Sequence, residues 1–345
     1  MKVLVTGGIG YIGSHTVVCL LEQGYEVVIA DNLSNSHGFI LEHIVEIAGK
    51  KPSFYQINIC DEEALDLLFE KEKNIEAVIH FAAYKAVGES VLDPLKYYKN
   101  NINGLVTLLQ VMQKRHCFKI VFSSSCSVYG NTQVLPVTEE TPFMLAESPY
   151  GNTKQIGEEI LKDVSLTSNL HAIALRYFNP VGAHQSGLLG ELPIGVPNNL
   201  IPVITQSAAG LRGNITVYGN DYDTIDGTCI RDYIHVIDIA EAHVKAIEWN
   251  DFEKQNFEIF NLGSGTGTSV LQAINAFEKA TGLKLNYNIG PRREGDVEKI
   301  WSDCLKSNQK LGWKTKLIIE DAMLSSWNWQ KLIPIYAKKH QITFK

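Results

Sequence analysis

The chain has 345 residues, of which 45% are apolar and 20% charged, and its formal net charge is −7. This composition is typical of a globular enzyme and excludes a largely disordered chain. At this length we expect one large two-lobed unit or two domains. The acidic balance and the lack of a long basic run argue against a nucleic acid or an anionic membrane as partner.

The cysteines and the N-terminus point to a reducing compartment. The six cysteines are scattered and form no CxxC pair, so we predict reduced, mostly buried thiols with neither a disulfide framework nor a metal site. No stretch approaches 18 consecutive apolar residues, and the N-terminal apolar run is too short for a signal peptide. These features predict a cytoplasmic protein.

The first 180 residues alternate short apolar runs with helical patterns. Residues 2–6 predict a buried strand, 14–23 a helix and 26–30 a second strand. Further strands are predicted at 77–81, 119–123 and 172–176. Strands that are apolar throughout belong in a parallel sheet covered on both faces. The alternation therefore predicts a doubly wound, Rossmann-type α/β domain over residues 1–178.

The second half of the chain has a different composition. Proline and glycine crowd the segment after residue 179, as is typical of loops that bind a ligand. A helix at 234–248 and a strand at 257–262 follow. We predict that residues of about 234–262 return to the Rossmann domain, and that 179–345 otherwise form a smaller, interleaved α/β lobe.

A glycine motif follows the first strand. Gly7, Gly10 and Gly13 form G-x-x-G-x-x-G between that strand and the first helix. Glycines here let the backbone approach a pyrophosphate, which then lies at the helix N-terminus. Asp31 ends the second strand, where a carboxylate can bind ribose hydroxyls and repel a 2′-phosphate. NAD is therefore favoured over NADP. The structural alternatives are that the glycines only form a tight turn and that Asp31 only caps a turn.

Tyr150 and Lys154 are four residues apart, so on a helix they share one face. A cation about 4 Å from the phenolate stabilises it by roughly 4 kcal/mol at an effective dielectric near 20. That is about three pKa units, which would bring a tyrosine of pKa near ~10 into the working range of a base. YxxxK alone is common by chance, but here a serine-rich strand end, FSSSCSVYG, accompanies it and can supply a proton relay.

The motifs TGGIGYIGSH, DNLSNS, KAVGES, SSSCSVYG, SPYGNTK, RYFNPVGAH, PNNLIP, GTCIRDYIHV, FNLGSG and PRREGD occur in this order. The chain thereby resembles the extended short-chain dehydrogenases and, among them, the UDP-galactose 4-epimerases. The resemblance implies NAD-dependent epimerisation at C4 of UDP-galactose and UDP-glucose through a 4-keto intermediate. It also implies that Tyr150 is the base, Ser125 the proton-relay serine and Lys154 the electrostatic partner and ribose anchor.

The same resemblance implies two sets of binding residues. Cofactor-contacting positions, besides the catalytic three, are Gly7, Gly10, Tyr11, Ile12, Gly13, Asp31, Asn32, Asn58, Ile59, Phe81, Ala82, Lys85, Asn100 and Phe178. Nucleotide-sugar positions are Lys85, Ser125, Tyr150, Asn179, Asn199, Leu200, Arg231, Arg293, Asp296 and Ile300. The two arginines would bind the diphosphate and Asp296 the uridine ribose. A salt bridge to adjacent acids is the alternative for Arg231, and Arg292 is expected to face solvent.

Three positions depart from the family pattern. Asn58 stands where aspartate is frequent, and its amide oxygen can still accept a hydrogen bond from adenine. Ala83 stands where glycine is common. Ile300 is intermediate between the tyrosine and the smaller residues that line the sugar pocket in the family, which leaves acceptance of 2-acetamido sugars open.

Rival functions on the same fold are a nucleotide-sugar 4,6-dehydratase and a UDP-glucuronate decarboxylase. Dehydratases carry an Asp-Glu pair just after the active-site hydroxyl, where this chain has Cys126 and Ser127. A non-catalytic NAD-binding scaffold is the rival of a different class. A homodimer through helices at 94–114 and 151–164 is implied by the family alone, and the physiological direction is set by metabolite supply.

Overall fold

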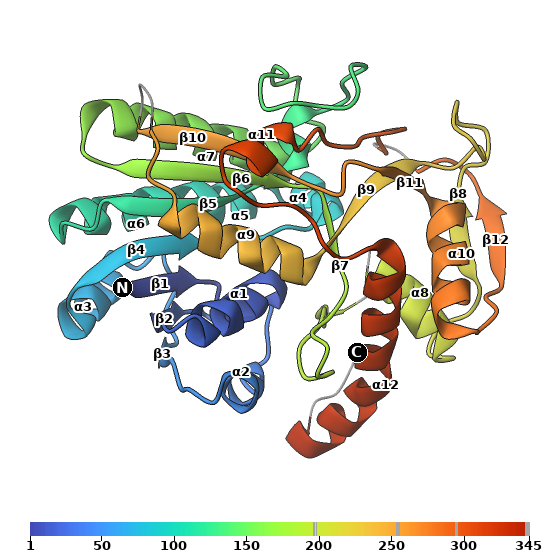
Figure 1. Ribbon diagram of the computed structural model, residues 1–345, viewed down its shortest axis with the longest axis horizontal. Coiled ribbons are helices and arrows are strands. Elements are labelled where there is room, and N and C mark those ends of the chain that lie inside the picture. The colour runs from blue at the N-terminus through green and yellow to red at the C-terminus, as the bar shows by residue number, and fades with distance from the viewer. Residues whose placement is uncertain (196, 198, 253–255, 294–295, 342–345) are drawn as a thin grey trace.

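The computed structural model describes residues 1–195, 197, 199–252, 256–293 and 296–341. Within them, seven parallel strands form a central sheet in the order β3-β2-β1-β4-β5-β6-β10 (Figure 1). The strands are β1 (Lys2–Thr6), β2 (Glu26–Ala30), β3 (Ser53–Tyr55), β4 (Ile75–His80), β5 (Lys119–Ser125), β6 (His171–Tyr177) and β10 (Phe257–Leu262). This order confirms the predicted doubly wound, Rossmann-type sheet.

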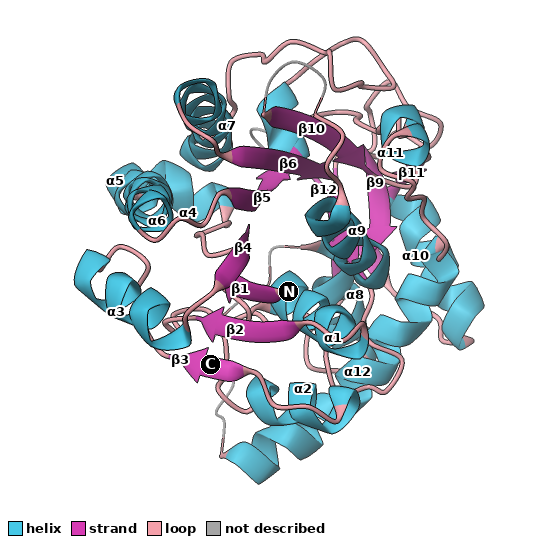
Figure 2. Cartoon of the chain, turned by 60° about the vertical axis from the view of Figure 1, so that its left-hand side comes forward, coloured by secondary structure: helices cyan, strands magenta, loops and turns pink. Residues whose placement is uncertain are grey.

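The strands bury both of their faces because their apolar residues are continuous. In β1, Val3 and Val5 pack into the core on one side of the sheet and Leu4 into the core on the other. Helices cover both sides, with α1, α2 and α9 on one and α3, α6 and α7 on the other (Figure 2). These helices are α1 (Tyr11–Glu22), α2 (Ile40–Ala48), α3 (Glu62–Glu72), α6 (Asn103–Lys114), α7 (Pro149–Thr167) and α9 (Val236–Glu248).

A smaller lobe is built from later segments. One sheet has the order β11-β9-β7 and a second pairs β12 with β8. The strands are β7 (Asn179–Val181), β8 (Ile215–Tyr218), β9 (Ile230–His235), β11 (Gly267–Ser269) and β12 (Tyr287–Gly290). The helices here are α8 (Leu200–Ala208), α10 (Val270–Thr281) and α12 (Ile319–His340), whereas α11 (Leu305–Gln309) packs against β10 of the main sheet (Figure 1). Between β9 and β11 the chain returns to the main sheet through α9 and β10, so the lobes interleave (Figure 1).

Some helices differ from their predicted extents. Helix α1 begins at Tyr11, three residues earlier than predicted, because Gly10 is its N-cap. The stretch 94–114 is interrupted, with α5 (Pro94–Tyr97), a π-helical turn η1 (Tyr98–Ile102) and then α6. Short helices α4 (Val87–Leu92) and η2 (Cys126–Tyr129), a 3₁₀ turn, complete the list. Sequence periodicity cannot detect a π turn, which is a local insertion often found at functional sites.

The six cysteines are free thiols, but the prediction that most of them are buried is wrong, because only Cys117 and Cys229 are buried and the other four are partly exposed. No helix within the described part of the chain is long and apolar enough to cross a membrane.

Candidate active site

The glycine loop after β1 has a backbone that only glycine fits. Gly7 has φ +72°, and a Cβ there would lie 2.8 Å from the amide nitrogen of Ala82. A Cβ on Gly13 would lie 2.2 Å from the carbonyl oxygen of Gly7. At Gly10, apart from its chain neighbours, an added Cβ would meet only that same oxygen among described atoms, at 3.2 Å. The outer side of the turn, at the N-terminus of α1, is therefore open to a pyrophosphate, and the loop fits NAD.

Asp31 holds the loop that follows β2. Its Oδ2 accepts a hydrogen bond from the amide of Ile9 at 3.1 Å, and its Oδ1 accepts from the amide of Leu33 at 2.8 Å and from Ser36 Oγ at 3.2 Å. Burial raises the pKa of this carboxyl group. A carboxylate has about four acceptor positions, so the turn-bracing role coexists with room for a ribose hydroxyl.

The remaining cofactor candidates lie where strands or helices face the carboxyl edge of the sheet. Tyr11 and Ile12 open α1, Asn32 follows β2, Asn58 and Ile59 follow β3, Phe81, Ala82 and Lys85 follow β4, Asn100 lies in η1 and Phe178 follows β6. Ligands bind at this edge in doubly wound sheets. The amide oxygen of Asn58 accepts from the amide of Cys60 at 3.0 Å, which leaves it one further lone pair for a ligand.

The catalytic candidates come together from β5 and α7. Ser125 ends β5 and caps η2, and its Oγ accepts a hydrogen bond from the amide of Ser127 at 3.2 Å. Ser148 caps α7 by accepting from the amide of Gly151 at 3.1 Å, which places Tyr150 in the first turn. The Ser125 side chain acts to lower the pKa of the Tyr150 phenol against the effect of burial, so the two hydroxyls are neighbours. The two groups predicted to move the proton therefore lie near each other.

Lys154 lies one turn along α7, but its ammonium group points elsewhere than predicted. Nζ donates to the carbonyl oxygen of Ser123 at 2.6 Å and lies 5.9 Å from the centroid of the Tyr150 ring. Burial raises the pKa of Tyr150 to about 12, and the hydrogen bond from Ser125 opposes that shift. Burial therefore dominates the pKa of the Tyr150 phenol in this arrangement, and the predicted lowering by Lys154 is not seen. Burial also lowers the pKa of Lys154 to about 8, against the opposing charge of Glu158.

The predicted diphosphate residues meet in the smaller lobe. Arg293 donates from Nη2 to Asp296 Oδ1 at 2.6 Å, and Arg231 Nη2 lies 3.8 Å from the same oxygen. Asp296 thus pairs with both arginines. The salt bridge predicted as the alternative role of Arg231 is therefore present, but its acid is distant in the chain and not adjacent. Arg292 is exposed, as predicted, and pairs with Asp221 at 2.7 Å.

Glu191 joins the two sets of binding candidates. It accepts from Lys85 Nζ at 3.1 Å and from Asn199 Nδ2 at 2.9 Å. Asn199 is the N-cap of α8, directly before Leu200. Asn179 begins β7. A cofactor candidate after β4 and a nucleotide-sugar candidate before α8 are therefore linked through one carboxylate.

Phe178 and Ile300 belong to one apolar cluster. Phe178 is 2% exposed and Ile300 5%, and both pack with Val128 and Tyr129 of η2. The rings of Phe178 and Tyr129 stack with centroids 6.5 Å apart. Cys126 packs against the same cluster. The predicted nicotinamide and sugar neighbours thus adjoin the turn that carries Ser125.

Known proteins match the chain over nearly its whole length. A family model described as GDP-mannose 4,6 dehydratase matches residues 4–325. The UDP-glucose 4-epimerase of Bacillus subtilis is 50% identical over 96% of this chain and 97% of that relative. The chain belongs to the UDP-glucose 4-epimerase family.

Two solved structures of this family have the same fold. A UDP-glucose 4-epimerase from Bifidobacterium longum, in complex with NAD⁺ and UDP, is 48% identical with a TM-score of 0.93, covering 97% of this chain and 99% of that one. A second, from Stenotrophomonas maltophila with bound NAD and formylated UDP-arabinopyranose, is 46% identical with a TM-score of 0.94, covering 98% and 100%. The predicted epimerase family, enzyme class and NAD as cofactor are confirmed.

Sequence reasoning missed two polar residues beside this candidate site, Asp232 and Glu191. Asp232, fully buried on β9, accepts from the amide and hydroxyl of both Ser264 and Ser302, and so fastens the segment after Asp296 next to Arg231. The sequence did offer a signal for Asp232, because it directly follows Arg231, a predicted diphosphate-binding residue. Glu191 carried no sequence signal, because its partner Lys85 lies 106 residues away in the chain and nothing in the sequence pairs it with Asn199.

Proposed function

We propose that this epimerase-family chain interconverts UDP-galactose and UDP-glucose with a retained NAD. The proximity of Ser125, at the end of β5, to Tyr150, in the first turn of α7, beside a glycine loop that fits a dinucleotide, carries the proposal. When bound, oxidised NAD supplies the acceptor for the C4 hydride and a second positive charge near the phenol. Each residue of the chain then has a separate task.

Tyr150 accepts the proton of the sugar C4 hydroxyl, directly or through Ser125. With burial holding the pKa of Tyr150 near 12, its deprotonation needs nearby positive charge. Lys154 contributes part of that charge from the next turn of α7 and anchors the cofactor ribose. The product of this first half-reaction is a 4-keto sugar.

The smaller lobe anchors the nucleotide. Arg231 and Arg293, which now share Asp296, turn to the diphosphate, and Asp296 binds the uridine ribose. Charge-assisted, bidentate contacts of this kind are strong and specific. The hexose, held by weaker contacts, rotates about its phosphate linkage and is reduced from its other face.

A 4,6-dehydratase is the second candidate, because the matching family model carries that description. Elimination of water needs an additional acid and base close to the reacting hydroxyl. Cys126 and Ser127 occupy the two positions after Ser125, and burial raises the pKa of the Cys126 thiol to about 12. Neither side chain can replace a carboxylate, which favours epimerisation.

The experiment that tests the proposal compares Tyr150→Phe with wild-type protein on UDP-galactose, with products separated by chromatography. We expect wild-type protein to form UDP-glucose and Tyr150→Phe to lose roughly 100-fold or more in kcat, the usual contribution of a general base. Tyr25→Phe is the matched control, since that phenol bonds Glu248 on the exposed surface. A product that has lost water would favour the dehydratase, and equal rates in Tyr150→Phe and wild type would contradict the assigned base.

A cytoplasmic location and a homodimer through residues 94–114 and 151–164 stay predictions. So does the range of accepted sugars, which depends on the space that Ile300 leaves. Assaying UDP-N-acetylgalactosamine beside UDP-galactose tests the sugar range, and light scattering of the purified protein tests the dimer.

A further inference from the structure

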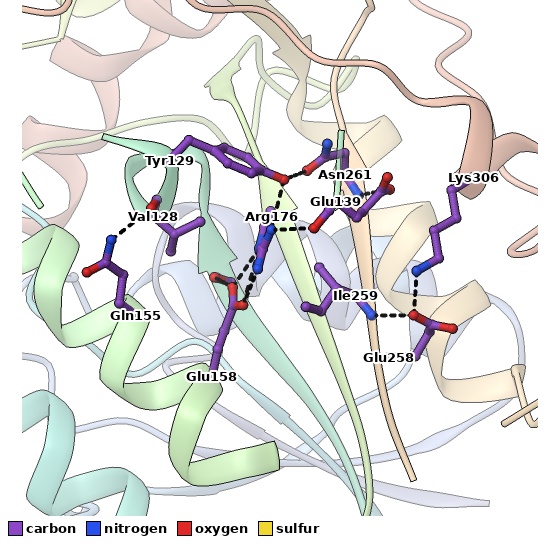
Figure 3. A network of polar contacts seen from close by, with 11 residues as sticks. Val128, Tyr129, Glu139, Gln155, Glu158, Arg176, Glu258, Ile259, Asn261 and Lys306 are labelled. Atoms are coloured by element: carbon purple, nitrogen blue, oxygen red, sulfur yellow. Dashed lines mark hydrogen bonds and ion pairs between the residues drawn. The ribbon is translucent and has the colours of Figure 1, made fainter. Parts of the chain in front are cut away.

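A buried ion pair lies one helical turn beyond Lys154. Glu158 continues the four-residue spacing of Tyr150 and Lys154 along α7, so all three share a face. The guanidinium of Arg176, on β6, contacts both carboxylate oxygens, with Nη2 2.6 Å from Oε2 and Nε 2.9 Å from Oε1 (Figure 3). The two side chains are only 2% and 3% exposed. This is the bidentate geometry that makes an arginine–carboxylate contact rigid.

The pair is tied to both ends of the turn that carries Ser125. Ser124, the residue before it, donates its hydroxyl hydrogen bond to Glu158 Oε1. Tyr129, the last residue of η2, accepts from Arg176 Nη1 at 3.0 Å (Figure 3). The segment between Ser124 and Tyr129 is therefore fixed to α7 and β6 through two side chains.

The remaining groups of this network are also satisfied. Tyr129 donates its hydroxyl to Asn261 Oδ1 at 2.5 Å, and Arg176 Nη1 also donates to the carbonyl oxygen of Glu139 at 3.3 Å. A fully satisfied buried network rigidifies its surroundings. For stability alone, an apolar pair of similar volume would serve as well as an ion pair. Its place between the catalytic serine turn and the catalytic helix points to a different role.

We propose that Glu158 and Arg176 are positioning residues, which set the Ser125 hydroxyl against the Tyr150 phenol. The inference rests on the proposed function, in which these two hydroxyls carry the C4 proton. Proton transfer requires heavy atoms within about 2.6–3.2 Å, and a misplacement of about 1 Å can cost on the order of 100-fold in rate. Neither residue touches the substrate positions themselves, so the network acts on the rate and not on binding.

The test uses two mild substitutions that leave the ion pair intact. Ser124→Ala removes the hydrogen bond at one end of the turn, and Tyr129→Phe removes the one at the other end. In each we expect kcat for UDP-galactose to fall about 10-fold, with KM and bound NAD unchanged, because only the placement of Ser125 is loosened. Glu158→Gln is a harsher variant, since it leaves the Arg176 charge without its partner.

Lys306→Met is the matched control. It breaks the Lys306–Glu258 ion pair, which lies beside the network on α11 and β10 (Figure 3) and does not touch the Ser125 turn. We expect wild-type kcat in this variant. Unchanged kcat in both Ser124→Ala and Tyr129→Phe, or a loss of kcat accompanied by higher KM and lost NAD, overturns the positioning role. Wild-type protein without any turnover overturns the proposed function as well, which distinguishes the two failures.

Discussion

The Rossmann half and the smaller lobe provide binding groups of different kinds. After β1, the loop owes its shape to backbone, with a left-handed glycine and glycines whose added Cβ atoms would meet neighbouring backbone. In the smaller lobe, Arg231 and Arg293 are instead held by Asp296 through ion pairs at 3.8 Å and 2.6 Å. A fixed backbone suits a group that stays bound, whereas side chains that can exchange an acid for a diphosphate suit a ligand that comes and goes. The difference fits an enzyme that retains its cofactor and exchanges its nucleotide sugar.

A fall in pH should have the largest effect of all on this comparison, because four buried histidines, His15, His43, His80 and His243, lie in the Rossmann half and only His235 is buried among the described histidines of the smaller lobe. Burial lowers the pKa of His15 and His80 to about 3 and that of His243 to about 4. The unfolded chain binds these protons below about pH 6.5 while the native state does not, so stability is present above that pH and is lost as pH falls towards 4. We expect the free energy of unfolding to drop by up to about 2 kcal/mol per histidine between pH 7 and 5.

Urea denaturation at the two pH values measures this drop, with bound NAD followed in parallel. An unfolding free energy that is the same at pH 5 and pH 7 would show that these histidines are protonated in the native state.

Gly13→Ala tests the glycine loop of the Rossmann half directly. Its new Cβ would lie 2.2 Å from the carbonyl oxygen of Gly7, and backbone cannot move away as a flexible side chain can. We expect a loss of about 3 kcal/mol of stability together with most of the bound NAD. Gly213→Ala, whose added Cβ meets no described atom within 4 Å, is the matched control. Full NAD content in both variants would contradict the proposed cofactor loop.

Arg293→Gln tests the diphosphate site of the smaller lobe. Its expected effect is the smallest of the three, because it changes the affinity for UDP and leaves bound NAD unchanged. Loss of a charge-assisted hydrogen bond, worth about 1.5–3 kcal/mol, should weaken UDP binding about 10- to 100-fold and leave bound NAD unchanged. Arg292→Gln removes the neighbouring charge, which pairs with Asp221 on the exposed surface, and should bind UDP like wild type. Calorimetric titration with UDP decides between them, and equal affinities in the two variants would remove Arg293 from the diphosphate site.

Sequence patterns predicted those features of the fold and the site that depend on residues close together in the chain. The glycine loop, Asp31 and the apolar strands follow from sequence because turn geometry and burial on both faces restrict the residue types there. The π turn η1 was missed because an extra residue in a helix barely changes its periodicity. The four-residue spacing of Tyr150 and Lys154 placed them on one face, but it could not show that Nζ bonds the carbonyl of Ser123.

Long-range polar partners were beyond prediction for a different reason. Glu191, Asp232 and the Glu158–Arg176 pair depend on which distant segments the fold brings together. An isolated charged residue in a sequence does not reveal whether its partner is solvent or a buried group. Two hints were visible in the sequence: Asp232 directly follows Arg231, and Arg176 follows the apolar stretch 172–175.

The most direct test of the account is turnover by purified protein on UDP-galactose without added nicotinamide, with bound NAD measured before and after many turnovers. A cofactor held by the glycine loop and regenerated in each cycle predicts that UDP-glucose accumulates while the NAD content stays constant. UDP-galactose that remains unconverted even when NAD is supplied, or conversion that requires a continuous supply of NAD, would contradict it.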